Sequence, residues 1–179
     1  MNIRSLSLAL FLLIAPTSAW AGPWSLGAEA GPMVWLFKEA PVSYAMTLTP
    51  GYEVMDGLIL EGVVGVRHYS FETSDKETAT FALPMMVGAR YLTHIYAGLS
   101  FVSGLHAGGF VLLEDVKNSE TAIQGSGYEQ SVVFEPGGRL VLGLDYQVTD
   151  TFALGLTGAL EVTPNNLFVT TGIGGRVEF

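Results

Sequence analysis

The chain has 179 residues, of which 49% are hydrophobic, and 8 Lys and Arg against 17 Asp and Glu give a formal net charge of −9. This acidic balance excludes a protein that binds nucleic acid through its phosphates, because such binding needs clustered cations. The absence of cysteine excludes disulfides, and we also expect no lipid anchor of the lipoprotein kind, which needs a Cys.

The first segment predicts export from the cytoplasm. Arg4 precedes an apolar run from Leu6 to Ile14, and Ala19-Trp20-Ala21 forms an A-x-A cleavage pattern. This arrangement is typical of a secretory signal peptide, which we place at residues 1–21. Neither this run nor any later stretch reaches about 18 uninterrupted apolar residues, so a helical membrane protein is not favoured. Residues 22–179 have a length that fits one domain.

Beyond residue 22, apolar and polar residues alternate with a period of two, the pattern of β-strands that have one apolar face. In one clear example, Leu60 and Val64 share a face, and Glu61 and Arg67 lie on the other. The sequence predicts eight strands, an even number that returns both ends of the chain to one side. The clear segments lie near residues 58–67, 81–91, 139–146, 152–162 and 169–179, and the weaker ones near 24–36, 44–54 and 95–112.

The connections alternate in length. Short turns are predicted at 55–57, 92–94 and 147–150, a short linker at 163–166, and longer acidic linkers at 37–43, 72–79 and 113–127. Strands of about ten residues with one apolar face, joined in this way, are typical of a transmembrane β-barrel. We therefore predict an all-β fold: an eight-stranded antiparallel up-and-down transmembrane β-barrel with its longer loops outside the cell.

Prolines interrupt this pattern. A closed barrel has no free edge that tolerates a missing backbone N–H, so we expect bulges or strand ends at these positions. The residues concerned are Pro32, Pro50, Pro84 and Pro136.

Aromatic residues beside the short turns indicate which face meets lipid. Tyr52, Tyr91, Tyr146, Phe152 and Phe179 all fall on the apolar face by parity. They predict an aromatic girdle at the periplasmic rim. The alternative is a soluble up-and-down barrel such as a lipocalin, whose outer face is dense in long polar side chains. Here the polar face is mainly Gly, Ser, Thr and Ala, which suits a crowded barrel interior.

The alternating strands, the sequence "DYQVTDTFALGL" from Asp145 to Leu156 and the terminal "GGRVEF" resemble a known family. It is that of the small eight-stranded outer-membrane β-barrels of Gram-negative bacteria, including the transmembrane domain of outer membrane protein A and outer membrane protein X. In that family the barrel-assembly machinery reads a C-terminal aromatic residue preceded by alternating apolar residues. The resemblance implies that Ile173, Val177 and Phe179 form such an assembly signal. It also implies location in the outer membrane, with outer-membrane lipid and the assembly machinery as partners.

Charged residues recur on the inward face. Eight strands enclose an interior just wide enough for side chains, so we predict that these groups form salt bridges that plug the lumen. The alternative is that part of the network gates small ions, with Arg67, Arg90 and Arg139 as the switching cations. The full set is Glu29, Glu53, Glu61, Arg67, Arg90, Glu135, Arg139, Asp145, Glu161, Arg176 and Glu178.

His68 and Ser70 give the one hint of catalysis. Two residues apart on a strand, they project from one face, and such a pair with an acid activates a hydroxyl nucleophile. An outer-membrane lipid A deacylase carries a similar H-x-S pair, but the Asn that follows its Ser is Phe71 here. We therefore expect no enzyme. His94 and His106 lack metal-ligand spacing, so no metal or other cofactor is expected either.

The sequence thus predicts a monomeric outer-membrane β-barrel with a structural or surface-interaction role. Its acidic segments at 72–79 and 113–127 would face the outside, suited to cationic partners or serving as a solvated surface. The first alternative is a narrow channel for ions or small solutes. The second is a lipid A-modifying hydrolase that uses His68 and Ser70.

Overall fold

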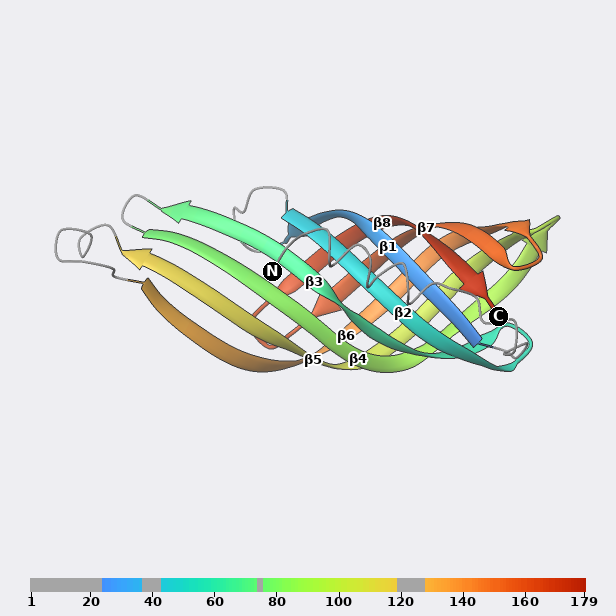
Figure 1. The fold of residues 1–179 in the computed structure, drawn as a ribbon, viewed down its shortest axis with the longest axis horizontal. Helices are drawn as coiled ribbons and strands as arrows, with labels where there is room; N and C mark the ends of the chain where they lie inside the picture. The colour runs from blue at the N-terminus through green and yellow to red at the C-terminus, as the bar shows by residue number, and fades with distance from the viewer. Residues whose placement is uncertain (1–23, 37–42, 74–75, 119–127) are drawn as a thin grey trace.

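The computed structural model describes residues 24–36, 43–73, 76–118 and 128–179, which form eight antiparallel strands closed into a barrel (Figure 1). This confirms the fold class predicted from the sequence, whereas the expected signal peptide at 1–21 lies outside the described residues. No helix in the described ranges is long and apolar enough to cross a membrane. The strands are β1 (Trp24–Trp35), β2 (Ser43–Met55), β3 (Leu58–Thr73), β4 (Lys76–Tyr96), β5 (Leu99–Asn118), β6 (Tyr128–Thr149), β7 (Phe152–Val162) and β8 (Leu167–Glu178).

Three tight turns mark one end of the barrel, which we call the turn end. The turn predicted at 92–94 is wrong: β4 continues to Tyr96, and the chain reverses at Ala97 and Gly98, which both have positive φ. Glycine adopts this left-handed conformation without steric cost, so Gly98 fixes the site of reversal. The turn predicted at 147–150 is also displaced, to Asp150 and Thr151, because Gln147 still pairs with Ala153.

At the opposite end, which we call the loop end, the strands are longer than the sequence suggested. The linker predicted at 72–79 is mostly strand, since β3 runs to Thr73 and β4 begins at Lys76. Likewise, β5 reaches Asn118 and β6 begins at Tyr128, within or next to the linker predicted at 113–127. These extensions carry polar residues on both faces, so they show no alternation to read from the sequence.

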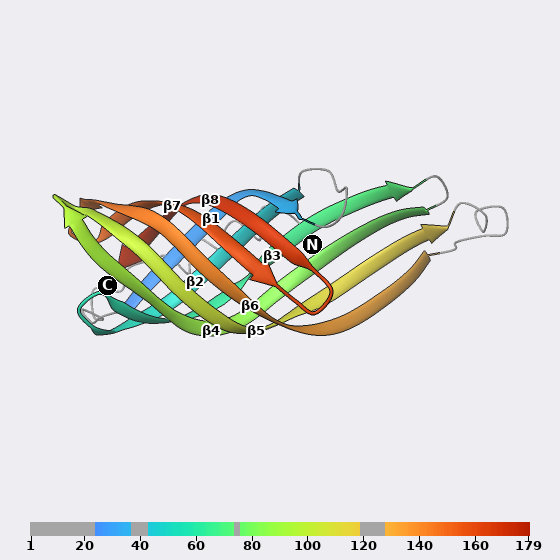
Figure 2. The same cartoon turned by 180° about the vertical axis from the view of Figure 1, so that it is seen from behind.

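The barrel wall has two heights. At the loop end β7 stops at Val162 and β1 at Trp35, whereas β3, β4, β5 and β6 continue well past them (Figures 1 and 2). Beyond the barrel rim these four strands remain paired with one another. We call this extension the projecting sheet; it comprises residues 69–73, 76–80, 114–118 and 128–137.

The register of strand pairing fixes the tilt of the wall. A path that starts at position 25 of β1 and moves from each residue to its paired residue on the next strand returns to β1 after one circuit of the barrel. It returns at position 35, ten residues further along. The displacement along the strand is ten residues of about 3.3 Å, and the path around the barrel is eight strand spacings of about 4.8 Å. The ratio of the two gives a strand tilt of about 40° to the barrel axis. We call this path the register line; it passes through Ser25, Gly51, Glu61, Gly88, His106, Arg139, Glu161, Phe168 and Trp35.

The bulges or strand ends expected at the prolines are absent from the described strands. Beside Pro50 the β2–β3 pairs lapse after Leu48 and resume at Gly51 in the same register. A proline removes one ladder hydrogen bond, but it inserts no extra residue, so the register survives. The shifts in register lie near the turn end instead. Pro32, Pro84 and Pro136 are likewise paired on one side, opposite Tyr44, Phe110 and Gly109.

Gly31 lies where β1 approaches β8 closely. A Cβ at this position would meet the backbone carbonyl oxygen of Thr171, so we expect Gly31→Ala to destabilise the barrel by about 1–3 kcal/mol. Gly62 is the matched control, because a Cβ there would lie 3.7 Å from the Pro50 side chain, an ordinary contact. Urea unfolding of the refolded protein in lipid vesicles measures both effects. Equal destabilisation by Gly31→Ala and Gly62→Ala would contradict the close approach.

Candidate functional site

The outer face of the barrel is apolar and exposed, as the parity of the strands predicts. Met46 on β2 and Ile173 on β8 have exposed fractions of 63% and 72%, and Leu105 on β5 reaches 68%. A soluble barrel of this size would bury such side chains in a core, since large exposed apolar surfaces are rare in soluble monomers. The geometry therefore opposes the soluble-barrel alternative and suits a wall in contact with lipid.

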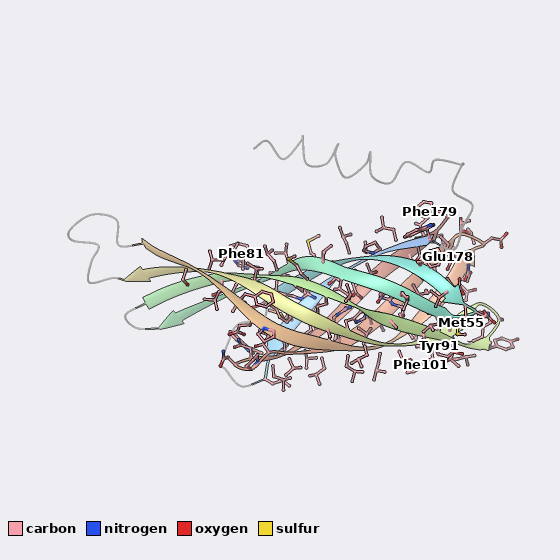
Figure 3. All side chains as sticks on the ribbon, turned by 90° about the horizontal axis from the view of Figure 1, so that it is seen from below. Met55, Phe81, Tyr91, Phe101, Glu178 and Phe179 are labelled. Carbon is pink, nitrogen blue, oxygen red and sulfur yellow. The ribbon has the colours of Figure 1, made fainter. Side chains whose placement is uncertain are left out.

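Aromatic side chains form a ring around the turn end, which we call the turn-end ring. Tyr52, Tyr91 and Tyr146 point outward and are exposed, whereas Phe152 and Phe179 are half-buried. Figure 3 shows Tyr91 and Phe101 at the same end as Phe179. The sequence reasoning missed part of this ring, and two of the missed residues lie beside the turn between β4 and β5, which it misplaced. The missed members are Trp24, Tyr96 and Phe101.

A second set of exposed aromatic residues, the loop-end ring, lies at Tyr44, Phe81 and Phe134. Figure 3 shows Phe81 well away from the turn end. On β4, ten residues separate Tyr91 from Phe81. At a rise of about 3.3 Å and a tilt of about 40°, ten residues span about 25 Å, the height of the apolar band of a transmembrane barrel.

One buried carboxylate holds two cations in the lumen. Arg67 on β3 and Glu161 on β7 meet across the barrel, with Nε 2.9 Å from Oε2 and Nη2 2.5 Å from Oε1. Their side chains are 1% and 0% exposed. The Nε of Arg139 is 3.2 Å from the same Glu161 Oε1. Ion pairs of this kind are strongly interdependent, because removing one member leaves an uncompensated buried charge.

A second cluster surrounds Glu61. Its carboxylate accepts from Arg90 Nε at 3.1 Å and lies 2.7 Å from His106 Nε2. Glu61, Gly88 and His106 are consecutive on the register line, so the missing side chain of Gly88 lets the imidazole reach across β4. The sequence reasoning weighed His106 only as a metal ligand. The available signal was its opposite parity to Phe101 and Leu105, the apolar residues of the outer face, which directs His106 inward.

The other charged residues fall into two groups. Glu29 accepts from both Arg139 and the Thr157 hydroxyl, and Arg176 pairs with Glu178 and lies 3.5 Å from Asp145. The structure therefore brings together nine of the eleven residues singled out from the sequence. The remaining two make other contacts: Glu53 accepts from the Gly57 backbone N–H at 2.8 Å, and Glu135 accepts from Asn165 and Asn166 at 2.8 and 3.2 Å.

An apolar layer, which the sequence reasoning did not anticipate, lies beside these charges toward the loop end. Trp35 stacks on Phe168 with ring centroids 5.1 Å apart, and Phe110 lies 6.2 Å from Phe168. A lumen filled by charges alone is therefore an incomplete description. We call this set the apolar plug; it comprises Met33, Trp35, Ala45, Val63, Ala82, Met86, Phe110, Leu112 and Phe168.

The space inside the barrel narrows from the turn end inward. A recess of about 550 Å³ opens there, lined in part by Glu53, Ser100 and Arg176. Further in, the spaces beside Glu29 shrink to about 20 and 10 Å³, room for one water molecule at most. The small size of these spaces, together with the apolar plug beside them, favours a filled lumen over the channel alternative.

The remaining sequence candidates have separate positions. His68 points outward and packs on Phe81, with ring centroids 4.7 Å apart, and the side chain of Ser70 lies outside the described residues. The described residues contain no group of three His, Asp or Glu side chains that could hold a metal ion. On β8, Ile173 is exposed on the outer face at mid-strand and Val177 is half-buried; at the turn end the Phe179 N–H donates to the Trp24 carbonyl at 2.9 Å.

Comparison with known proteins finds similarity in structure alone. No protein-family model and no curated protein sequence matches the chain. Neisserial surface protein A aligns with a TM-score of 0.63 and 15% identity over 88% of this chain and 97% of that chain. Ail, the attachment invasion locus protein of Yersinia pestis, aligns with a TM-score of 0.58 and 12% identity over 87% and 96%.

Ail has also been solved in complex with the heparin analogue sucrose octasulfate, and that structure aligns with a TM-score of 0.57 and 15% identity over 87% and 96%. At these identities the likeness is one of fold. The chain has the closed eight-stranded antiparallel fold of the small outer-membrane β-barrels.

Proposed function

We propose that this protein is an outer-membrane β-barrel that presents its projecting sheet to partners outside the cell. Three observations support location in a membrane: the exposed apolar outer face, the two aromatic rings, and their separation of about 25 Å. In such barrels the short turns face the periplasm and the longer loops face outward. This orientation places the projecting sheet beyond the outer leaflet.

The observation that carries the proposal is the outer edge of β6 in the projecting sheet. Residues 128–137 pair with β5, but in the described part of the chain the β6–β7 pairs begin only at Gly138. On its outer side this segment is not paired with a further strand among the described residues, and near its end Glu135 binds Asn165 and Asn166 of the β7–β8 linker. Such an edge is a template on which an extended segment of another protein adds as a further strand.

The charge of the projecting sheet indicates the chemistry of the partner. The sheet carries six acidic residues against Lys76 and Lys117. It is suited to a cationic or neutral extended segment, and not to a sulfated sugar of the kind bound in one Ail structure. The attachment role in the name of Ail supports a surface role here. The acidic residues are Glu72, Glu77, Glu114, Asp115, Glu129 and Glu135.

The lumen supports the same conclusion. Arg67, Glu161 and Arg139 are tied together in its centre, and the apolar plug lies next to them. A barrel closed by two layers of different chemistry is a rigid support for the sheet, whereas a pore needs a continuous aqueous path. Function is therefore assigned to the surface of the protein.

The test uses a peptide of alternating Lys and Val, eight residues long, as a cationic strand probe. We expect it to bind the refolded barrel, and we expect Val132→Pro to weaken binding about tenfold by removing an edge N–H. Val132 is 71% exposed on the outer face, so its side chain is not needed for the barrel interior. Fluorescence anisotropy of the labelled peptide measures the affinity.

Val132→Thr is the matched control, because it changes the side chain at the same position but keeps the backbone N–H. It should bind the peptide as the unmodified protein does. Equal weakening by Val132→Pro and Val132→Thr, or no binding to the unmodified barrel, would argue against strand addition at this edge.

A further inference from the structure

The lipid-facing wall contains a groove where bulky side chains give way to small ones. Pro50, Gly62 and Ala89 belong to three neighbouring strands and share the outer parity, which makes the wall thin there. The groove has a volume of about 640 Å³. Its larger lining residues are Trp24, Tyr52, Leu60, Val87 and Glu61, and the Glu61 side chain is buried on the lumen side.

The groove has one polar end and one apolar end. Trp24 and Tyr52 meet edge to face, with ring centroids 4.9 Å apart, and belong to the turn-end ring. Pro50 lies two residues from Tyr52 toward the loop end, and Ala89 lies two residues from Tyr91 in the same direction. The groove thus starts at the aromatic ring, where Trp and Tyr favour the lipid headgroup level, and continues into the apolar band.

We propose that this groove binds one acyl chain of a phospholipid in the leaflet at the turn end. The inference rests on the proposed function in so far as it requires the barrel to be in a membrane. The headgroup would lie beside Trp24 and Tyr52, and the chain would run over Gly62 between Leu60 and Val87. This order of polar and apolar contacts complements the order of groups along a phospholipid.

A second copy of the chain is a poorer occupant of the groove. A two-fold contact would place the groove against itself, because such an interface uses the same patch on both subunits. Two facing hollows would leave the space over Gly62 unfilled, and unfilled space loses the dispersion contacts that drive association in lipid. A flexible hydrocarbon chain fills the same space from one side.

Gly62→Leu is designed to fill the groove without disturbing the wall. A Cβ on Gly62 would lie 3.7 Å from Pro50 Cγ and 3.9 Å from the Met86 carbonyl oxygen, both ordinary contacts. Gly158→Leu is the matched control: Gly158 shares the outer parity on β7, and a Cβ there would meet only the Leu142 carbonyl oxygen at 3.9 Å. Both variants add the same side chain to the lipid-facing wall.

The probe is a phosphatidylethanolamine that carries a photoactivatable diazirine in one acyl chain, mixed into vesicles that contain the refolded protein. Mass spectrometry of the cross-linked peptides gives the sites of attachment. We expect adducts on β2, β3 and β4 at the groove to exceed those elsewhere on the apolar band by about tenfold, and Gly62→Leu to remove this excess. Gly158→Leu should leave the excess unchanged.

Two outcomes would overturn the proposal while leaving membrane insertion intact. The first is an even spread of adducts around the band that Gly62→Leu does not change. The second is a groove protected from the lipid in a protein that sediments as a dimer, which would assign the groove to a second copy. Absence of lipid adducts on every strand would instead overturn the location in a membrane, and the groove with it.

Discussion

Replacing Glu161 by Gln is expected to destabilise the barrel by about 3–5 kcal/mol, because it leaves two buried cations without their shared counter-charge. Glu161 is 0% exposed and binds Arg67 and Arg139 at the centre of the lumen. The substitution keeps the shape of the side chain, so the loss reports on charge and not on packing. Urea unfolding in lipid vesicles, followed by gel mobility of the unheated protein, measures the change.

Glu178→Gln provides the comparison at the mouth of the barrel. Glu178 also pairs with an arginine, Arg176, but its side chain is 35% exposed. Solvent screens such a pair, so we expect Glu178→Gln to lower the free energy of unfolding by less than about 1 kcal/mol. If Glu161→Gln unfolded at the same urea concentration as Glu178→Gln, the central ion pairs would have no structural role.

The second large effect concerns conductance. In a planar bilayer we expect the folded protein to show no single-channel conductance. We expect the same of Arg139→Ala, because the apolar plug still fills the lumen in this variant. Combining Arg139→Ala with Phe110→Ala and Phe168→Ala removes side chains from both layers, and single-channel openings should then appear. Large hydrophobic side chains replaced by Ala leave cavities, and within a lumen such cavities join into a path for water.

The folded state of each variant must be checked first, because every Phe→Ala change in a packed region costs about 3–5 kcal/mol. Heat-dependent gel mobility serves this purpose. Conductance in the unmodified protein would contradict the plug directly. Conductance in Arg139→Ala alone would show that the charges, and not the aromatic residues, close the lumen.

Parity predicted which side chains point into the barrel, but it could not predict which of them meet. Glu61 alternates with Leu60, so its inward direction follows from the sequence alone. The contact of Arg67 with Glu161 depends on a shear of ten residues, which is set by pairings between strands. No local pattern in either strand carries that information.

The apolar plug was missed for a related reason. Met33 and Trp35 are inward by parity but apolar by type, so they weaken the alternation of β1 and conceal the direction of its side chains. Phe110 has the same effect on β5. Two of the segments recognised as weak from the sequence thus contribute large apolar side chains to the interior. In these two strands the weak alternation resulted from apolar side chains that fill the lumen, and the segments are strands nonetheless.

The projecting sheet could not be read from the sequence either. Lys76 pairs with Thr73 on one side and with Asn118 on the other, in a region where polar residues occupy both faces. Without an apolar face there is no period of two to detect. The strand extensions follow from continued hydrogen bonding between neighbouring strands, a property of the assembled sheet.

Closure of the barrel imposes an order on its folding. Seven of the eight strand pairings join neighbours in the chain, whereas the eighth joins Ser25 of β1 to Glu178 of β8. Hairpins therefore form from local contacts, but this seam brings together positions 153 residues apart and must wait for all the others. An open sheet would leave two rows of backbone groups unpaired in hydrocarbon, where each costs several kcal/mol. We therefore expect entry into a bilayer to be coupled to closure of the seam, and neither half of the chain to be stable in a membrane on its own.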